Sequence, residues 1–185
     1  MRTELRNAVG ALALCIALAS GCGDPAAPRP SIAMSATVNG LPWHAGGPGA
    51  PPGSAFLIPH LDQALSVAAV RVVSSPYQYI REDISLSIAH VTGPGSYVLG
   101  SPWALGSPPG TASATYHVFE TRISDSSFTN TYYYTSPTAA GTVVLNQFDP
   151  ATRTVAGRFS FEAESGTGTR VVITSGSFSG HYNTD

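Results

Sequence analysis

The chain has 185 residues, of which 11% are charged, and its nine basic residues are all arginine. The formal net charge of −2 excludes the basic surface that nucleic-acid binding needs. Charged residues this sparse also exclude helices with charged solvent-facing stripes, whereas abundant Gly, Pro, Ser and Thr favour strands and turns.

The first element, residues 1–21, is predicted to be a cleaved signal peptide. Arg2 and Arg6 precede an apolar run from Ala8 to Ala19, which is shorter than the roughly 20 residues of a membrane-spanning helix. The next four residues, Ala-Ser-Gly-Cys, end at Cys22 and resemble the bacterial lipobox. The resemblance implies that Cys22 is lipidated and becomes the first residue of the mature chain.

The segment 22–31 is predicted to tether the protein to a membrane. Two or more acyl chains on Cys22 would give stable attachment, and three prolines make the following stretch a semi-rigid spacer. Gly23 stands where some Gram-negative lipoproteins carry an aspartate that retains them in the inner membrane. We therefore expect a bacterial cell-envelope protein with the outer membrane favoured, and an ordinary secreted protein is the alternative.

Residues 32–185 are expected to form one domain without cysteine chemistry. Cys15 leaves with the signal peptide and lipid caps Cys22, so the mature chain has no thiol for a disulfide, a metal or a nucleophile. Seven arginines and ten acidic residues remain, which gives a formal charge of −3.

Strand signals begin with Ser35–Ala45. Two short strands there flank Asn39-Gly40, a pair that suits a type I′ hairpin because both residues tolerate positive φ. Ala64–Val73 is apolar on both alternating faces and predicts a central strand covered on both sides. Residues 83–91 alternate aliphatic side chains with serines, which predicts a half-buried strand.

Two loops rich in Pro and Gly, 46–53 and 101–110, interrupt the strands. A turn and a short strand are predicted at 93–100, and longer strands at 112–119 and 128–134.

The strongest periodicity is in 154–164, where apolar and polar side chains alternate as in a one-sided antiparallel strand. Its predicted partner is Gly141–Phe148. The turn between them uses Asp149, whose carboxylate can accept bonds from following amides, and Pro150, which presets φ. A last strand, 170–182, is expected to close the sheet.

These elements predict an all-β fold, an antiparallel β-sandwich or incomplete β-barrel of eight to ten strands. The stretches ATVNGLPWHA (36–45), ISLSIAHVTGPGSYVLG (84–100) and 141–182 resemble small bacterial envelope lipoproteins with a single all-β domain of unknown function. The resemblance implies the fold and the location. It implies no activity, because that family has no established catalytic residues.

Aromatic residues are the candidate binding residues. In the strand 128–134, Tyr132 and Tyr134 share one face and Tyr133 the other, so at least one set is a candidate for exposure. Exposed tyrosines, and Trp103 in its Pro/Gly-rich loop, suit stacking on sugar rings or contact with a partner. The competing interpretation places Tyr132 and Tyr134 in the core and Tyr133 against a loop.

The sequence predicts no catalytic constellation, metal site or cofactor. Its five histidines stand in separate segments, without the spacing that puts two imidazoles on one metal. Glu82 and Asp83 are neighbours on a strand and point to opposite faces. Glu162 and Glu164 share a polar face, and a hydrolase using two carboxylates would need them buried in a cleft.

The leading functional hypothesis is a lipid-anchored envelope protein whose β-domain binds a ligand or partner without catalysis. A glycan, a lipid or another envelope protein is the expected partner, besides the membrane that Cys22 reaches through its lipid. A structural component that assembles on the envelope surface is the first alternative, and a hydrolase is the second.

Overall fold

A computed structural model describes residues 31–58, 64–100 and 107–184, and in these ranges the chain is all-β. The Pro/Gly-rich segment 46–53 lies between strands, as predicted, and so do residues 107–110 of the second such loop. Twelve strands are present among the described residues: β1 (Ile32–Val38), β2 (Leu41–His44), β3 (Ser54–Ile58), β4 (Ala64–Ser74), β5 (Gln78–Ile88), β6 (Gly95–Leu99), β7 (Ala112–Arg122), β8 (Phe128–Tyr134), β9 (Gly141–Asp149), β10 (Thr154–Ser165), β11 (Arg170–His181) and β12 (Asn183–Thr184).

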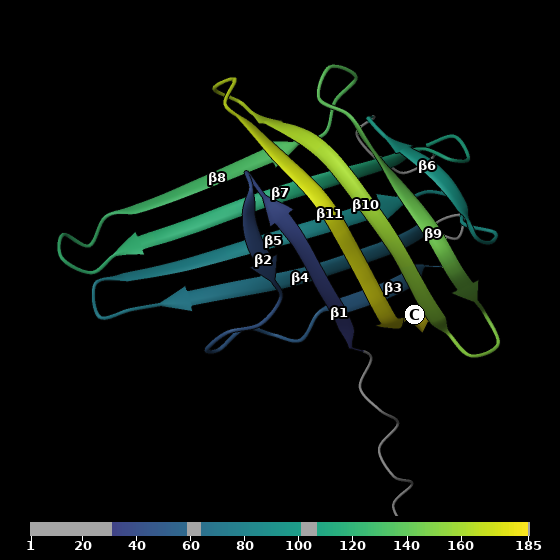
Figure 1. Cartoon of the computed structure of the whole chain (residues 1–185), viewed down its shortest axis with the longest axis horizontal. Coiled ribbons are helices and arrows are strands. Elements are labelled where there is room, and N and C mark those ends of the chain that lie inside the picture. Colours follow the sequence, from purple (N-terminus) through teal and green to yellow (C-terminus); the bar gives the residue numbers. More distant parts are fainter. Residues whose placement is uncertain (1–30, 59–63, 101–106, 185) are drawn as a thin grey trace, which may run out of the picture.

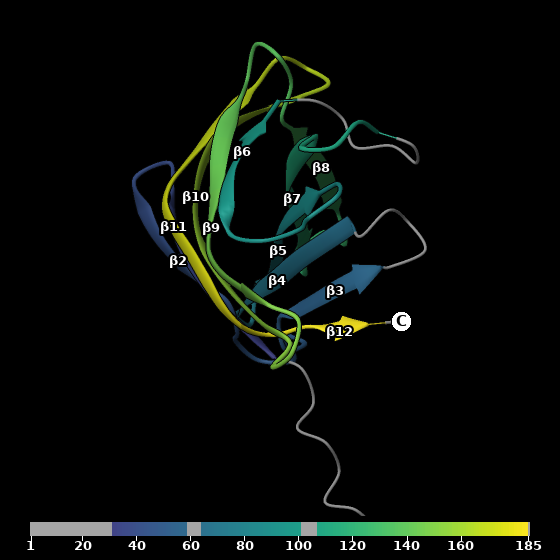
Figure 2. The ribbon, with the colours of Figure 1, turned by 90° about the vertical axis from the view of Figure 1, so that its right-hand side faces the viewer.

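The strands form one sheet that folds over on itself into two layers (Figure 1, Figure 2). The back layer has the order β3-β4-β5-β7-β8, and the front layer has the order β6-β9-β10-β11-β1-β2. The layers meet where β6 runs beside β7 and where the end of β8 pairs with β10. This is the predicted sandwich or incomplete barrel, antiparallel except for the short β6–β7 and β12–β3 contacts.

The two layers differ in how far they extend. The strands of the front layer cross those of the back layer, and the β4–β5 and β7–β8 hairpins project beyond the crossing (Figure 1). In that projecting part even Val73, near the end of β4, is 46% exposed. The back layer is therefore covered over part of its length and solvated at its outer end.

Local sequence explains two of the hairpins. Asn39 and Gly40 both have positive φ, 48° and 82°, as the predicted type I′ turn between β1 and β2 requires. In the β9–β10 turn, Asp149 Oδ1 accepts hydrogen bonds from the Ala151 amide at 2.8 Å and the Thr152 amide at 3.3 Å. Both hairpins are confirmed.

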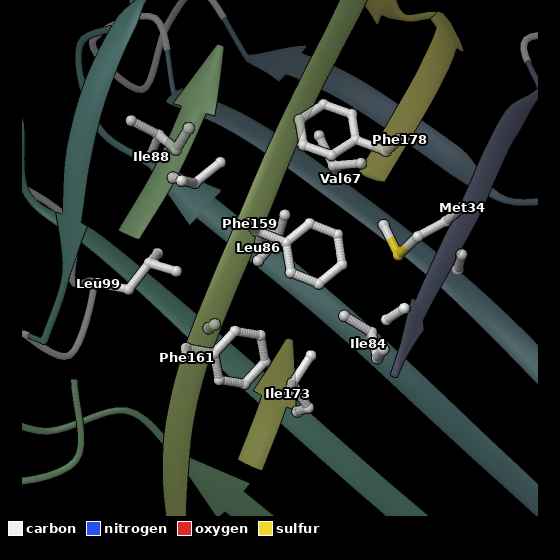
Figure 3. Packing of buried hydrophobic residues seen from close by; sticks show 14 of the residues in the cluster. Met34, Val67, Ile84, Leu86, Ile88, Leu99, Phe159, Phe161, Ile173 and Phe178 are labelled. Atoms are coloured by element: carbon white, nitrogen blue, oxygen red, sulfur yellow. The ribbon is translucent and has the colours of Figure 1, made fainter. Parts of the chain in front are cut away.

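The core fills the space between the layers (Figure 3). Phe159 and Phe161 of β10 and Phe178 of β11 lie against aliphatic side chains of the back layer such as Leu86. Trp43 of β2 is fully buried. Each such side chain contributes roughly 1.5–3 kcal/mol relative to exposure, so the hydrophobic alternation visible in the sequence holds the two layers together.

A β-bulge in β11 shifts which residues face the core. Val171 and Ile173 are buried at odd positions, whereas Phe178 and Tyr182 are buried at even ones. The register against β10 slips at this point, and Ser175 has φ of 51°. The extra residue of the bulge restores the inward orientation of the later aromatic side chains.

The strand count is higher than the expected eight to ten because β3 and β12 were not predicted. β3 is a five-residue strand that follows a Pro-rich loop, and β12 has two residues. β3 pairs antiparallel with the neighbouring β4. β12 depends on a segment far away in sequence, since it runs parallel to β3.

Candidate functional site

The structure separates the three candidate tyrosines of β8 as alternation requires. Tyr132 and Tyr134 are 44% and 54% exposed on the outer face of the back layer. Tyr133 is half-buried and faces inward, with its ring centroid 5.8 Å from that of Tyr116. The interpretation that placed Tyr132 and Tyr134 in the core is wrong, because the core lies on the side of the sheet that Tyr133 faces.

The register of β5, β7 and β8 gathers further aromatic side chains around these tyrosines. Asp83, His117 and Tyr132 are successive neighbours across the three strands, and so are Arg81, Phe119 and Asn130. Because paired residues share a face, all six lie on the outer face. Five aromatic residues form what we call the aromatic row: Tyr79, Phe119, Phe128, Tyr132 and Tyr134.

Ring geometry ties the members of the row to one another. The Tyr132 and Tyr134 rings are nearly parallel, with centroids 6.1 Å apart, and the His117 ring stacks on Tyr132 at 4.1 Å. Phe119 contacts Tyr79 at 6.5 Å and Phe128 at 6.2 Å between centroids. Phe128 is 69% exposed, so the row offers wide apolar faces to solvent.

Polar groups are fixed beside the rings. Asp83 Oδ2 lies 3.0 Å from His117 Nδ1, and His117 Nε2 is hydrogen-bonded to the Asn130 side chain. The Arg81 guanidinium donates hydrogen bonds to both oxygens of Asp83, with Nη2 2.8 Å from Oδ1. The hydrogen bond to Asp83 raises the pKa of the Arg81 guanidinium. The outer face thus combines flat apolar rings with oriented hydrogen-bonding groups.

Glu82 points to the opposite, inner face, as its alternation with Asp83 predicts. It is 8% exposed and forms an ion pair with Arg71. Tyr116 donates a hydrogen bond to Glu82 Oε1 at 2.6 Å, and Arg71 donates to the Pro42 carbonyl at 3.0 Å. Burial, followed by the hydrogen bond to Glu82, raises the pKa of Tyr116 well above its ordinary value. This cluster joins β4, β5 and β7 to β2 in the interior.

The other carboxylate pair lies on the surface. Arg170 contacts Glu164 at 3.0 Å and Glu162 at 3.5 Å, and the two glutamate side chains are 35% and 47% exposed. The condition for the hydrolase alternative, burial of both in a cleft, is not met. In the described ranges there is also no group of three His, Cys, Asp or Glu side chains placed to hold a metal ion.

A groove of about 930 Å³ lies on the outer face of the front layer. Its floor consists of small residues of β1, β10 and β11, and Arg158 borders it. No ligand-specific arrangement was predicted there, and its Ser, Ala and Gly lining carries little recognisable chemistry.

Two predicted residues, Cys22 and Trp103, lie outside the described residues. In the part of the chain that is described, no helix is long and apolar enough to cross a membrane. Sequence reasoning missed Tyr79, Phe119 and Phe128 as partners of the tyrosines. Alternation within each strand was visible, but the register between β5, β7 and β8 was not.

The family model described as Domain of unknown function (DUF6252) matches residues 71–180. This stretch is more than half of the chain, and it contains the complete aromatic row. No curated protein and no solved structure matches the chain. The chain therefore belongs to the DUF6252 family, a family of domains of unknown function.

Proposed function

We propose that this protein is a lipid-anchored component of the bacterial cell envelope whose β-domain binds glycans through the aromatic row. The single observation that carries the binding role is the exposed row on β5, β7 and β8. An exposed aromatic cluster on a protein surface marks an interaction site more often than a scattered apolar residue does.

The chemistry of the row favours sugar rings over a purely apolar ligand. The C–H faces of a pyranose pack on flat aromatic rings, and its hydroxyls need donors and acceptors at the rim. Tyr132 and Tyr134 provide near-parallel rings, while Arg81, Asp83 and Asn130 provide the polar groups. A lipid tail has no hydrogen-bonding groups with which to use the further donors and acceptors of these side chains.

The envelope location is supported by the signal-peptide pattern and by Cys22. Lipidation of Cys22 can be tested independently of glycan binding. A Gram-negative host expressing the full chain is fed radioactive palmitate, and we expect label in the wild type and none in Cys22→Ser. Label that persists in Cys22→Ser, or a wild type without label, would contradict lipidation.

Glycan binding is tested by co-sedimentation of the full chain, solubilised in detergent, with peptidoglycan sacculi, cellulose and xylan. We expect retention on at least one of them and its loss in the double variant Tyr132→Ala/Tyr134→Ala. Tyr77→Ala is the matched control, because Tyr77 is 77% exposed but lies in the β4–β5 turn outside the row. Failure of the wild type to bind any of the three, or equal loss in Tyr77→Ala, refutes the proposal.

A further inference from the structure

β8 has an open edge over most of its length. β7 pairs along one side of β8, whereas β10 pairs on the other side only at Tyr133 and Tyr134. From Phe128 to Tyr132, no strand of the described ranges runs along that other side, as Figure 1 shows. The open edge is therefore the five-residue segment Phe128–Tyr132.

The backbone at this edge presents unpaired groups in a regular order. The Arg122 amide donates to the Ser127 carbonyl, and the Thr135 amide donates to the Ala114 carbonyl. Because hydrogen-bonding direction alternates along an antiparallel strand, odd-numbered residues of β8 face β7. Phe128, Asn130 and Tyr132 consequently direct their backbone amides toward the open side.

This edge lacks the features that usually prevent edge-to-edge pairing. Proteins protect edges with charges, proline, bulges or short strands. The edge strand β2 fits that rule, since it has four residues and contains Pro42. Segment Phe128–Tyr132 has no charge and no proline, and its Thr and aromatic residues have high strand propensity.

The segment is self-complementary about Asn130. If a second copy pairs antiparallel with Asn130 opposite its own equivalent, Phe128 stands opposite Tyr132 and Thr129 opposite Thr131. Aromatic–aromatic and Thr–Thr cross-strand pairs both stabilise an antiparallel pairing relative to alanine pairs. No like charges face each other within the segment. A two-fold axis through Asn130 therefore satisfies both copies equally.

We propose that two copies of this protein pair through the open edges of β8, antiparallel and centred on Asn130. The pairing continues the back layer across the two-fold axis and joins both aromatic rows on one face. β10 limits it to five residues of each strand, so the contact is small and the dimer forms in a concentration-dependent way. This pairing is one way in which the protein could assemble on the envelope surface, and it does not depend on glycan binding.

Disulfide trapping tests the pairing. In the full chain with Cys15→Ala and Cys22→Ala, an introduced cysteine is the only thiol. Hydrogen-bonded residues across an antiparallel pair have Cα atoms about 5.5 Å apart, within the range of a disulfide. Under mild oxidation in cells, we expect Asn130→Cys to shift to twice its mass on a non-reducing gel. Asn146→Cys, on an exposed residue of β9, should remain monomeric.

A second cross-linking experiment tests the register in which the two β8 segments pair. Phe128→Cys and Tyr132→Cys, co-expressed with distinguishable tags, should cross-link to each other more than to themselves. Adding Asn130→Lys to both chains places two positive charges face to face and should abolish that product. A monomeric Asn130→Cys, dimer formation equal to that of Asn146→Cys, or cross-links only to other proteins would overturn the proposal. Glycan retention in the sedimentation assay is a separate result, and it neither supports nor contradicts the pairing of two copies.

Discussion

Tyr116 and Glu82 form a polar contact in an interior filled mostly with apolar side chains. The tyrosine hydroxyl donates to Glu82 Oε1 at 2.6 Å, and Arg71 pairs with the same carboxylate. Both Tyr116 and Glu82 are more than nine-tenths buried. A buried carboxylate that loses a partner keeps its desolvation cost without compensation.

Tyr116→Phe should therefore lower the free energy of unfolding by about 1.5–3 kcal/mol, the range for hydrogen bonds to charged groups. Urea denaturation near neutral pH measures this change. Tyr77→Phe is the matched control, since Tyr77 is exposed in a turn, and its effect should stay within about 0.5 kcal/mol. Equal effects of the two substitutions would show that the buried hydrogen bond contributes nothing.

The same residue predicts alkaline sensitivity. Burial and Glu82 raise the pKa of Tyr116, so above pH 10.0 the unfolded chain loses this proton while the folded chain keeps it. Stability from Tyr116 is therefore complete below pH 10.0 and declines above it. The free energy of unfolding should fall less steeply with pH in Tyr116→Phe than in the wild type. The same pH dependence in the wild type and in Tyr116→Phe would contradict this role of Tyr116.

For single residues, the sequence predicted which side chains share a face of a strand, but it did not predict which face of the sheet the other layer covers. Alternation separated Tyr133 from Tyr132 and Tyr134, and Glu82 from Asp83. It could not say that Tyr133 faces the core, because that depends on where the front layer lies. The ion pair of Arg71 with Glu82 could not be predicted from the sequence either, because it depends on the register in which β4 pairs with β5.

At the scale of elements, the start of β9 is held unusually close to β10. A Cβ placed on Gly141 would come within 2.2 Å of the Ser160 carbonyl oxygen and 2.3 Å of Phe161 Cβ. Neither neighbour is the flexible end of a side chain. Glycine at this position is therefore a condition for the pairing of β9 with β10.

Gly141→Ala is expected to cost about 1–3 kcal/mol of stability through overpacking. Gly166→Ala is the control, because a Cβ on Gly166 meets no atom within 4 Å. Thermal unfolding of both variants distinguishes the two positions. A Gly141→Ala variant as stable as the wild type would mean that the strands can separate at little cost.

The β9–β10 turn should respond to acid. Hydrogen bonds from the Thr152 side chain and from the Ala151 and Thr152 amides lower the pKa of Asp149 below 3.8. A lowered pKa stabilises the folded chain above pH 3.8, and this contribution is lost as the pH falls through the folded value. The wild type should be more stable than Asp149→Ala near neutral pH, and the difference should shrink in acid. A difference that does not change with pH would refute this role.

Elements formed by neighbouring segments were the ones that sequence could define. The β1–β2 and β9–β10 hairpins follow from Asn39-Gly40 and Asp149-Pro150, whose effects are local. The contacts of β8 with β10 and of β12 with β3 join strands that are not consecutive in the chain. The parallel contact of β6 with β7 joins consecutive strands without a tight turn between them. They depend on how the layers fold over, and residue type does not encode that.

At the scale of the whole molecule, the candidate site exists only after the sheet has formed. The aromatic row draws on β5, β7 and β8, with β6 inserted between β5 and β7 in the chain. The sequence led to an all-β domain and to tyrosines worth testing. The row itself depends on the register of the assembled back layer.

The projecting end of the back layer has a dynamic consequence. Where both faces of a sheet meet solvent, few buried contacts oppose local opening, and backbone amides exchange with deuterium faster than those of a covered core. Amides of the β4–β5 and β7–β8 hairpin ends should exchange before those near Leu86, although they belong to the same strands. A molecule that settles on this end would slow their exchange, so protection there would reveal an occupant of any chemical class.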